Sequence, residues 1–300
     1  MIKHLLVPLD GSELAESVLP AVRYLSRKLN SLITLIHVVE KSAPSEVHGQ
    51  KHLTNAGDAE KYLNDIAKTY FPDNKNINLH VHETEVKDVA KSIAEHAGEF
   101  TPDLIIMCSH GESGMRDILF GSIARQVIAL GETPVLLIQP SPEESVTDFK
   151  CEEMLIPLDG NPEHTQSIDI AGQIAGVCGS VIHLIMAVPF FGNLAGQWTS
   201  SSKLLPGTTT RMLEMMAEES DDYLWKVKSE LQKSVSEVTV ETIREDPEDA
   251  IINTAVKINA DIIVLATHSR SAMEAFWSGS VTAKVCKSIK KPVLLVPVRR

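Results

Sequence analysis

Two kinds of apolar pattern alternate along this chain, and the alternation occurs twice. Short apolar runs are each followed by a longer stretch whose apolar residues recur every three or four positions. The runs predict strands covered on both faces, and the longer stretches predict amphipathic helices. In the first half the predicted strands are residues 3–9, 32–39, 78–86, 104–107 and 135–138, and the predicted helices are 12–30, 56–70, 86–98 and 122–130.

The second half repeats this order. A strand followed by a helix, several times over, indicates βαβ units and a mostly parallel sheet, so the fold class is α/β. Pro20 falls inside the first predicted helix, where it is expected to cause a kink. The predicted strands of the second half are residues 153–158, 181–188, 238–243, 262–266 and 293–297.

The residues themselves also repeat, which indicates one fold present twice. LLVPLDGS at residues 5–12 returns as MLIPLDGN at 154–161, and DLIIMCSHG at 103–111 returns as DIIVLATHS at 261–269. We expect two domains, residues 1–140 and 151–300, joined by a polar, proline-bearing linker. The spacing is longer in the second copy, and we place its extra residues in a Gly-, Ser- and Thr-rich loop at 189–210.

Composition narrows the classes of partner. The chain is 43% hydrophobic and 23% charged, as in ordinary globular proteins, and its formal net charge is −12. This acidic excess disfavours nucleic acid and anionic membranes as partners. No leader segment and no apolar run of roughly 20 residues is apparent, so we expect a cytoplasmic protein. The four cysteines form no C-x-x-C pair and are expected to be buried thiols.

Candidate chemistry gathers where predicted strands end. Asp10 and Cys108 each close a strand, and ligands of open parallel sheets bind at that edge. Gly111 follows, and then Gly121-Ser122 opens a helix, where free amides and the helix dipole attract phosphate. Two plainer interpretations stay open. In the first, Gly121-Ser122 is an ordinary helix start. In the second, Asp10 caps the helix that follows it.

These residues resemble the universal stress protein family in its tandem two-domain form. Its ATP-binding members carry glycine, two residues, glycine, nine residues, and then glycine before serine or threonine, and this chain departs from that pattern only at Cys108. The Pro-x-Asp of the first strand, His37-Val38 and the closing Pro-Val-Leu-Leu also match. The resemblance implies Rossmann-like domains, each with a five-stranded parallel sheet in the order 3-2-1-4-5 and helices on both faces.

The resemblance also implies the ligand, an adenine nucleotide (ATP, ADP or AMP) with Mg²⁺. Ser269 stands where the motif has a glycine that adopts positive φ, which costs a residue with a Cβ about 1–2 kcal/mol. We therefore expect binding mainly in the first domain. The implied site residues are Pro8, Leu9, Asp10, Val38, Met107, Cys108, Gly111, Gly121, Ser122 and Ile123 in the first copy, and Asp159, Ala187, Ala266, Ser269, Gly279 and Ser280 in the second.

Function and assembly follow from the same resemblance. We expect a stress-response or regulatory protein without evolved catalysis, since the P-loop lysine is absent. The alternatives are a nucleotide-free interaction protein, and an adenylating or ATP-hydrolysing enzyme on the same fold. Family members pair through their last strands, so we expect the two halves to form an internal pseudo-dimer, and two chains to form a homodimer.

Other candidate residues favour no further site. His80 and His82 share one strand face, and His48 and His52 lie four apart, but spacing supplies no third metal ligand. Cys108 and His110 lack an orienting carboxylate, so we expect no catalytic residues. Trp198, Trp225 and Trp277 are expected in the core or in an interface.

Overall fold

The computed structural model describes residues 1–41, 46–47, 50–51, 53–109, 121–139, 149–194, 204–268 and 280–298. Strands and helices alternate in both halves, as the sequence predicts. The first half contains β1 (His4–Pro8), α1 (Glu13–Glu16), α2 (Leu19–Leu29), β2 (Leu32–Glu40), β3 (Glu46–Val47), β4 (Gln50–Lys51), α3 (Ala56–Tyr70), β5 (Ile77–Val86), α4 (Val89–Phe100), β6 (Leu104–Cys108), α5 (Ser122–Leu130) and β7 (Val135–Ile138).

The second half repeats the alternation with one long helix. It contains β8 (Glu153–Leu158), η1 (Pro162–His164), α6 (Thr165–Cys178), β9 (Val181–Ala187), η2 (Phe191–Asn193), α8 (Pro206–Leu231), β10 (Glu237–Ile243), α9 (Pro247–Lys257), β11 (Ile262–His268), α11 (Val281–Ser288) and β12 (Val293–Val298).

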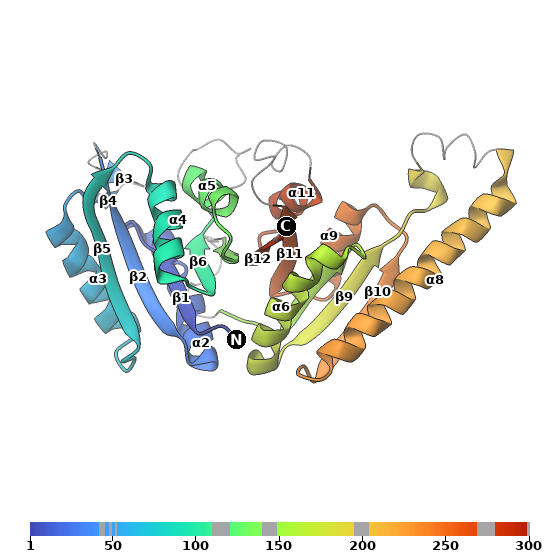
Figure 1. Ribbon diagram of the computed structural model, residues 1–300, viewed down its shortest axis with the longest axis horizontal. Helices are drawn as coiled ribbons and strands as arrows, with labels where there is room; N and C mark the ends of the chain where they lie inside the picture. Colours follow the sequence, from blue (N-terminus) through green and yellow to red (C-terminus); the bar gives the residue numbers. More distant parts are fainter. Residues whose placement is uncertain are drawn as a thin grey trace.

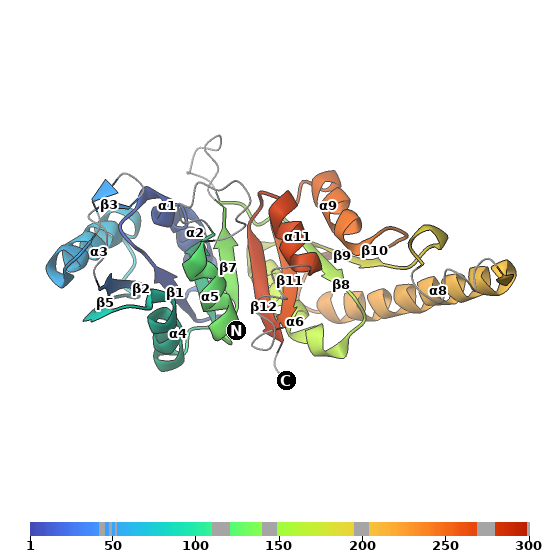
Figure 2. The ribbon, with the colours of Figure 1, turned by 90° about the horizontal axis from the view of Figure 1, so that it is seen from above.

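Ten strands form one sheet in the order β10-β9-β8-β11-β12-β7-β6-β1-β2-β5. Within each half of this sheet all pairings are parallel and the order is 3-2-1-4-5, which confirms the expected topology; β3 and β4 form a separate antiparallel pair. The two five-stranded sheets are not separate, however, because β7 and β12 pair antiparallel at the centre (Figures 1 and 2). The expected pseudo-dimer through the last strands is confirmed.

The β7–β12 junction is symmetric. Leu136 lies opposite Leu294, its own counterpart in the repeated Pro-Val-Leu-Leu segment. Val135 lies opposite Leu295, and Leu137 opposite Val293, so each pairing recurs with the copies exchanged. This is the isologous pattern of a two-fold interface, here within one chain. The pairing covers two apolar strands that would otherwise be sheet edges.

Helices cover both faces of the sheet, and each face has its own core. One cluster joins the sheet to α2, α3, α6 and α8, and the other joins it to α4, α5, α9 and α11. Ile105, Leu137 and Ile263 are fully buried in the second cluster, which runs across both halves. Continuous apolar strands between two helix layers explain why these runs show no apolar–polar alternation.

The first predicted helix is broken in two, because Pro20 has no N–H to donate to the carbonyl of residue 16. Helix α1 ends at Glu16, and α2 begins at Leu19 with Pro20 in its first turn. The break replaces the expected kink. Helix α4 also starts later than expected, because Val86 still belongs to β5 and Asp88 caps the helix by accepting from the Lys91 amide at 2.9 Å.

The expectation of a loop over residues 189–210 was wrong at its carboxyl end, where the chain is helical. Pro206 opens α8, whose 26 residues run beside β10 and β9 (Figure 1). Proline suits the first helical turn, and Thr209 and Leu213 are buried, so packing overrides the loop-like composition. Residues 195–203 lie outside the described residues. Within the described ranges, no helix has both the length and the apolar character needed to cross a membrane.

Candidate functional site

The candidate site lies where β1, β2 and β6 end side by side. The chain runs from β1 to β2 on one side and later returns to β6 on the other, and ligands bind open α/β sheets at such a switch point. The Leu9 amide donates to the Ile36 carbonyl at 2.9 Å. Pro8 pairs with Ile36 of β2 and Leu6 with Ile105 of β6, so Leu9 and Asp10 leave β1 at the edge where Val38 of β2 and Met107 and Cys108 of β6 also lie.

His37 ties the ends of β1 and β2 together. Its ring is buried, and its Nδ1 lies 2.8 Å from the Leu9 carbonyl oxygen. A carbonyl only accepts hydrogen bonds, so Nδ1 carries the proton. The sequence marked His37 only as part of a family motif, whereas the structure shows that it positions the Leu9 backbone.

Asp10 orders the turn that leaves β1. Its Oδ1 accepts hydrogen bonds from the Ser12 amide at 2.9 Å and from the Ser12 hydroxyl at 2.6 Å. Between them Gly11 has φ +92°, and a Cβ there would lie 2.8 Å from Leu53 Cδ1, so glycine is required. The cap of α1 is Ser12, whose Oγ accepts from the Ala15 amide. The interpretation of Asp10 as the cap of this helix was therefore wrong. Asp10 instead accepts hydrogen bonds from Ser12, and Ser12 is the cap.

The chain returns from β6 to α5 through Ser109. Its amide donates to the Ile138 carbonyl at 2.9 Å, and its carbonyl accepts from the Gly121 amide at 2.7 Å. Gly121 is the N-cap of α5 and has no side chain to accept from the first turn. Ser122 and Ile123 are exposed there. Within the described ranges no side chain caps this first turn, and a first turn without such a cap presents its amides to an anion. His110 and Gly111 lie outside the described residues.

The second copy places different groups at the corresponding strand ends. The Oδ1 of Asp159 accepts from the Asn161 amide at 3.0 Å and lies 2.8 Å from His164 Nδ1. Ala187 and Ala266 are half-buried at the ends of β9 and β11. The first turn of α11 is capped by Ser280, whose Oγ accepts from the Ala283 amide at 3.2 Å. Ser269 and Gly279 lie outside the described residues.

Comparison with known proteins identifies the family. The sequence model of the universal stress protein family matches residues 1–139 and again 151–297. The chain belongs to the universal stress protein family. A universal stress protein of Methanocaldococcus jannaschii is 30% identical over 149 residues, which are 48% of this chain and 81% of that protein. One of Bacillus subtilis is 24% identical over 153 residues, 46% of this chain and all of its own length.

Solved structures agree on the doubled fold. A universal stress protein from Archaeoglobus fulgidus superposes with a TM-score of 0.63 at 18% identity, covering 99% of this chain and 98% of that one. A protein of unknown function from Pseudomonas aeruginosa gives a TM-score of 0.69 at 16% identity, covering 99% and 93%. These likenesses show the fold. The tandem form of the family follows from the two matches of the family model.

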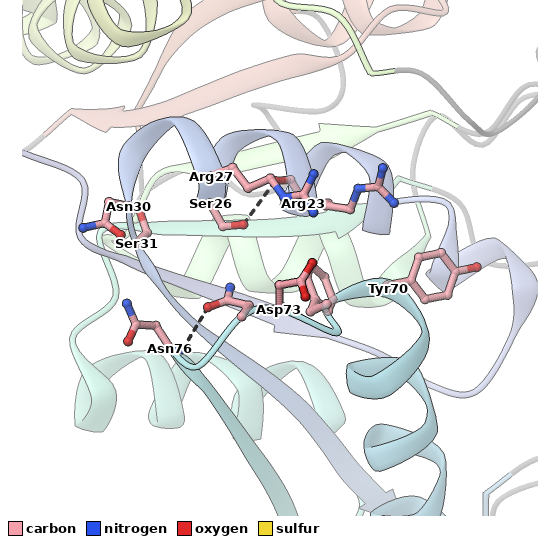
Figure 3. Close-up of a pocket in the computed structure, with 10 residues that line it drawn as sticks. Arg23, Ser26, Arg27, Asn30, Ser31, Tyr70, Asp73 and Asn76 are labelled. Carbon is pink, nitrogen blue, oxygen red and sulfur yellow. Dashed lines mark hydrogen bonds between the residues drawn. The ribbon is translucent and has the colours of Figure 1, made fainter.

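A pocket of about 250 Å³ in this universal stress protein lies apart from the strand-end site. Arg23, Arg27, Tyr70, Asp73 and Asn76 are among the residues that line it (Figure 3). These residues come from the middle and end of α2, from the end of α3 and from the segment before β5. The pocket therefore lies at the amino ends of the strands, opposite to the edge where α/β folds bind ligands.

Sequence reasoning missed one group of potential ligands. His80 and His82 lie on β5, and the structure places His96 of α4 beside them. Burial and the neighbouring imidazoles lower the pKa of His80. No spacing rule connects His96 to the other two, because it comes from the next element, so a metal site was not predicted.

The structure describes one of the three tryptophans and all four cysteines. Trp225 is 54% exposed on α8, with Lys228 Nζ 4.5 Å from the centre of its ring. Trp198 and Trp277 lie outside the described residues. All four cysteines lie among the described residues and none forms a disulfide; Cys151 and Cys286 are buried, whereas Cys108 and Cys178 are half-buried. Trp225 is therefore outside the core, and an interface role for it stays a prediction; the expectation of buried thiols was wrong for Cys108 and Cys178.

Proposed function

We propose that this universal stress protein is a regulatory protein that holds an adenine nucleotide, mainly in its first domain, without catalytic turnover. The observation that carries the proposal is that, among the described residues, no side chain caps the first turn of α5, whose N-cap Gly121 is hydrogen-bonded to Ser109, the residue after β6. Amides that lack an intrahelical acceptor and a capping side chain bind phosphate without a cationic residue. A net charge of −12 is then no obstacle, since the phosphate contacts come from the backbone.

The residues at the strand ends fit such a ligand. Leu9, Asp10 and Val38 are the proposed contacts for base and ribose, and Met107 and Cys108 border them on β6. The amides of Ser122 and Ile123, with the backbone of Gly111 and Gly121, are the proposed phosphate contacts. Leu9 is held by hydrogen bonds from its amide and to its carbonyl, so that the contact surface is formed before the ligand binds.

The absence of turnover is part of the proposal. An adenylating or ATP-hydrolysing enzyme on this type of fold has a serine- and glycine-rich loop after its first strand. Here Asp10-Gly11-Ser12 leads straight into α1, with Ser12 as its cap. The sequence also has no P-loop lysine to neutralise charge at a transferred phosphate.

The second domain is proposed to bind nucleotide weakly. The Ser280 hydroxyl already accepts from the first turn of α11, and His164 lies against Asp159. Domain limits of 1–140 and 151–300, a homodimer of chains and a cytoplasmic location stay predictions. Light scattering measures the oligomeric state directly.

The test is to denature protein purified without added nucleotide and to identify the released small molecules by mass spectrometry. We expect an adenine nucleotide near one per chain. Calorimetry with ATP, with and without Mg²⁺, then gives the affinity and shows whether the metal contributes. Protein that carries no nucleotide and shows no heat with ATP, ADP or AMP contradicts the proposal and favours a nucleotide-free interaction protein.

A further inference from the structure

Three histidines from two elements converge beside the outer strand of the first half. His80 and His82 lie two residues apart on β5, so they share one face of the strand. His96 lies on α4, which packs on that face. The ligand atoms of the three rings all lie within 4.8 Å of one another. This cluster shares no residue with the proposed nucleotide site.

The tautomer of His96 is set by its own helix. The Nδ1 of His96 lies 2.7 Å from the Ser92 carbonyl oxygen, and the ring is buried. Because a carbonyl accepts and does not donate, Nδ1 carries the proton and Nε2 keeps its lone pair. A ring N–H bonded to a backbone carbonyl is the outer-shell arrangement that orients a metal-binding histidine.

Two buried polar atoms of the residues around His96 have no hydrogen-bond partner among the described residues. They are Nε2 of His80 and Oγ of Ser92. Leaving a buried polar group unsatisfied costs free energy, and native proteins rarely do so. The ring of His80 is held in place by His96 and Phe100, with centroid distances of 4.7 Å and 5.0 Å. Its unsatisfied nitrogen is thus fixed next to the two other imidazoles.

We propose that His80, His82 and His96 bind a divalent transition-metal cation, and that Zn²⁺ is the ion best suited to them. Three imidazole nitrogens are a common ligand set for Zn²⁺, with a water or another ligand in the fourth position. Zn–N bonds of about 2.0–2.1 Å in a tetrahedral site place ligand nitrogens about 3.4 Å apart. Small rotations of the three rings would bring the ligand nitrogens from within 4.8 Å of one another to this spacing.

A bound ion would fasten an edge strand to its helix. Strand β5 pairs with β2 alone in the ten-stranded sheet, so its other edge has no partner strand. A metal bridging β5 and α4 would resist local opening of this edge. The site therefore adds a metal-dependent stabilisation of the first half.

The second half has no counterparts of His80, His82 and His96 at the matching positions, so it serves as an internal comparison. The strand registers place Glu241 and Ile243 of β10 where β5 has His80 and His82, since Ile36 and Ile185 are their matching partners on β2 and β9. Thr254 follows the N-cap of α9 at the same distance as His96 follows that of α4. Glu241 is instead paired with Lys257 at 3.1 Å. We assign the site to the first half alone.

The experiment uses the full chain, freed of metal by a chelator and then dialysed. Zn²⁺ is titrated against a competing chromophoric chelator, and histidine ring nitrogens are followed by NMR. We expect one Zn²⁺ per chain, with shifts confined to three of the 11 histidines. His96→Gln and His82→Gln should each lower the affinity by at least about 100-fold, more than loss of an outer-shell partner.

His183→Gln is the matched control, because His183 is a half-buried strand histidine of the second half that lies against Glu153. It should bind Zn²⁺ like the unchanged protein. A Zn²⁺-dependent rise in Tm that His96→Gln abolishes would support the same site. Circular dichroism confirms that each variant folds. Equal binding by His96→Gln and the unchanged protein, no binding at all, or ring shifts at other histidines would overturn the proposal.

Discussion

The two halves share their buried strands and differ at the edge where those strands end. In the first half, Asp10 accepts from Ser12, and helix α5 starts after a glycine that offers no side-chain cap. In the second half, Asp159 lies against His164, and α11 starts after Ser280, which caps it. The core pattern is thus common to both copies, whereas the polar groups around the ligand edge have diverged.

This difference comes from a shift of one residue in where the helix begins. Gly121-Ser122 and Gly279-Ser280 are the same dipeptide in the repeat, but α5 begins at the serine and α11 begins after it. When serine is the first helical residue, it is not positioned to accept from the first-turn amides; when it is the N-cap, it is. A sequence motif can therefore be present in both copies while the amides are available in one.

The largest expected effect tests the symmetry of the junction on which the comparison depends. Leu136 and Leu294 face each other across β7 and β12, and each is 1% exposed. Replacing either with alanine removes buried methyl groups and should lower the free energy of unfolding by about 2–5 kcal/mol. Urea denaturation measures it. Because the two positions are related by the repeat, we expect similar losses; a loss at one position alone means that the junction is not symmetric.

The next largest effect is on nucleotide affinity. Gly121 has φ −56° and ψ 153°, which valine also adopts, so Gly121→Val leaves the backbone unstrained while its side chain covers the first-turn amides. We expect a loss of ATP affinity of at least about tenfold, equivalent to about 1.4 kcal/mol. Calorimetry with ATP measures it.

Gly279→Val is the matched variant of the second copy and should leave first-domain binding unchanged. If Gly279→Val removes ATP binding while Gly121→Val keeps it, the two copies have been assigned in the wrong order. If neither change alters ATP binding, the nucleotide proposal fails.

Much of the fold was predictable because local signals agree with packing. Helices α3 and α5 were predicted with the observed bounds, since apolar periodicity and a polar or glycine start coincide at Asn55 and Gly121. The start of α8 was missed, because a segment rich in glycine, serine and threonine becomes helical where Thr209 and Leu213 find a buried surface. Local composition does not indicate which segments will find such a buried surface.

The candidate site was predictable in part for a different reason. Strand ends identify which residues meet at the sheet edge, and the resemblance supplied their roles. Hydrogen bonds between side chain and backbone were not predictable, so the sequence did not reveal that Ser12, held by Asp10, is the residue that caps α1. The sequence also did not predict that His96 lies beside His80, because this depends on how α4 is placed relative to β5.

The smallest expected effect concerns the caps themselves. Ser280→Ala removes the oxygen that accepts from the Ala283 amide, and loss of a serine N-cap costs about 1 kcal/mol. Ser122→Ala changes an exposed residue inside the first turn of α5, where alanine is the better helix former, so the free energy of unfolding should stay within about 0.5 kcal/mol. Urea denaturation of both variants, at unchanged m, gives the difference. Equal losses would mean that both serines cap their helices, and the structural contrast between the two copies would disappear.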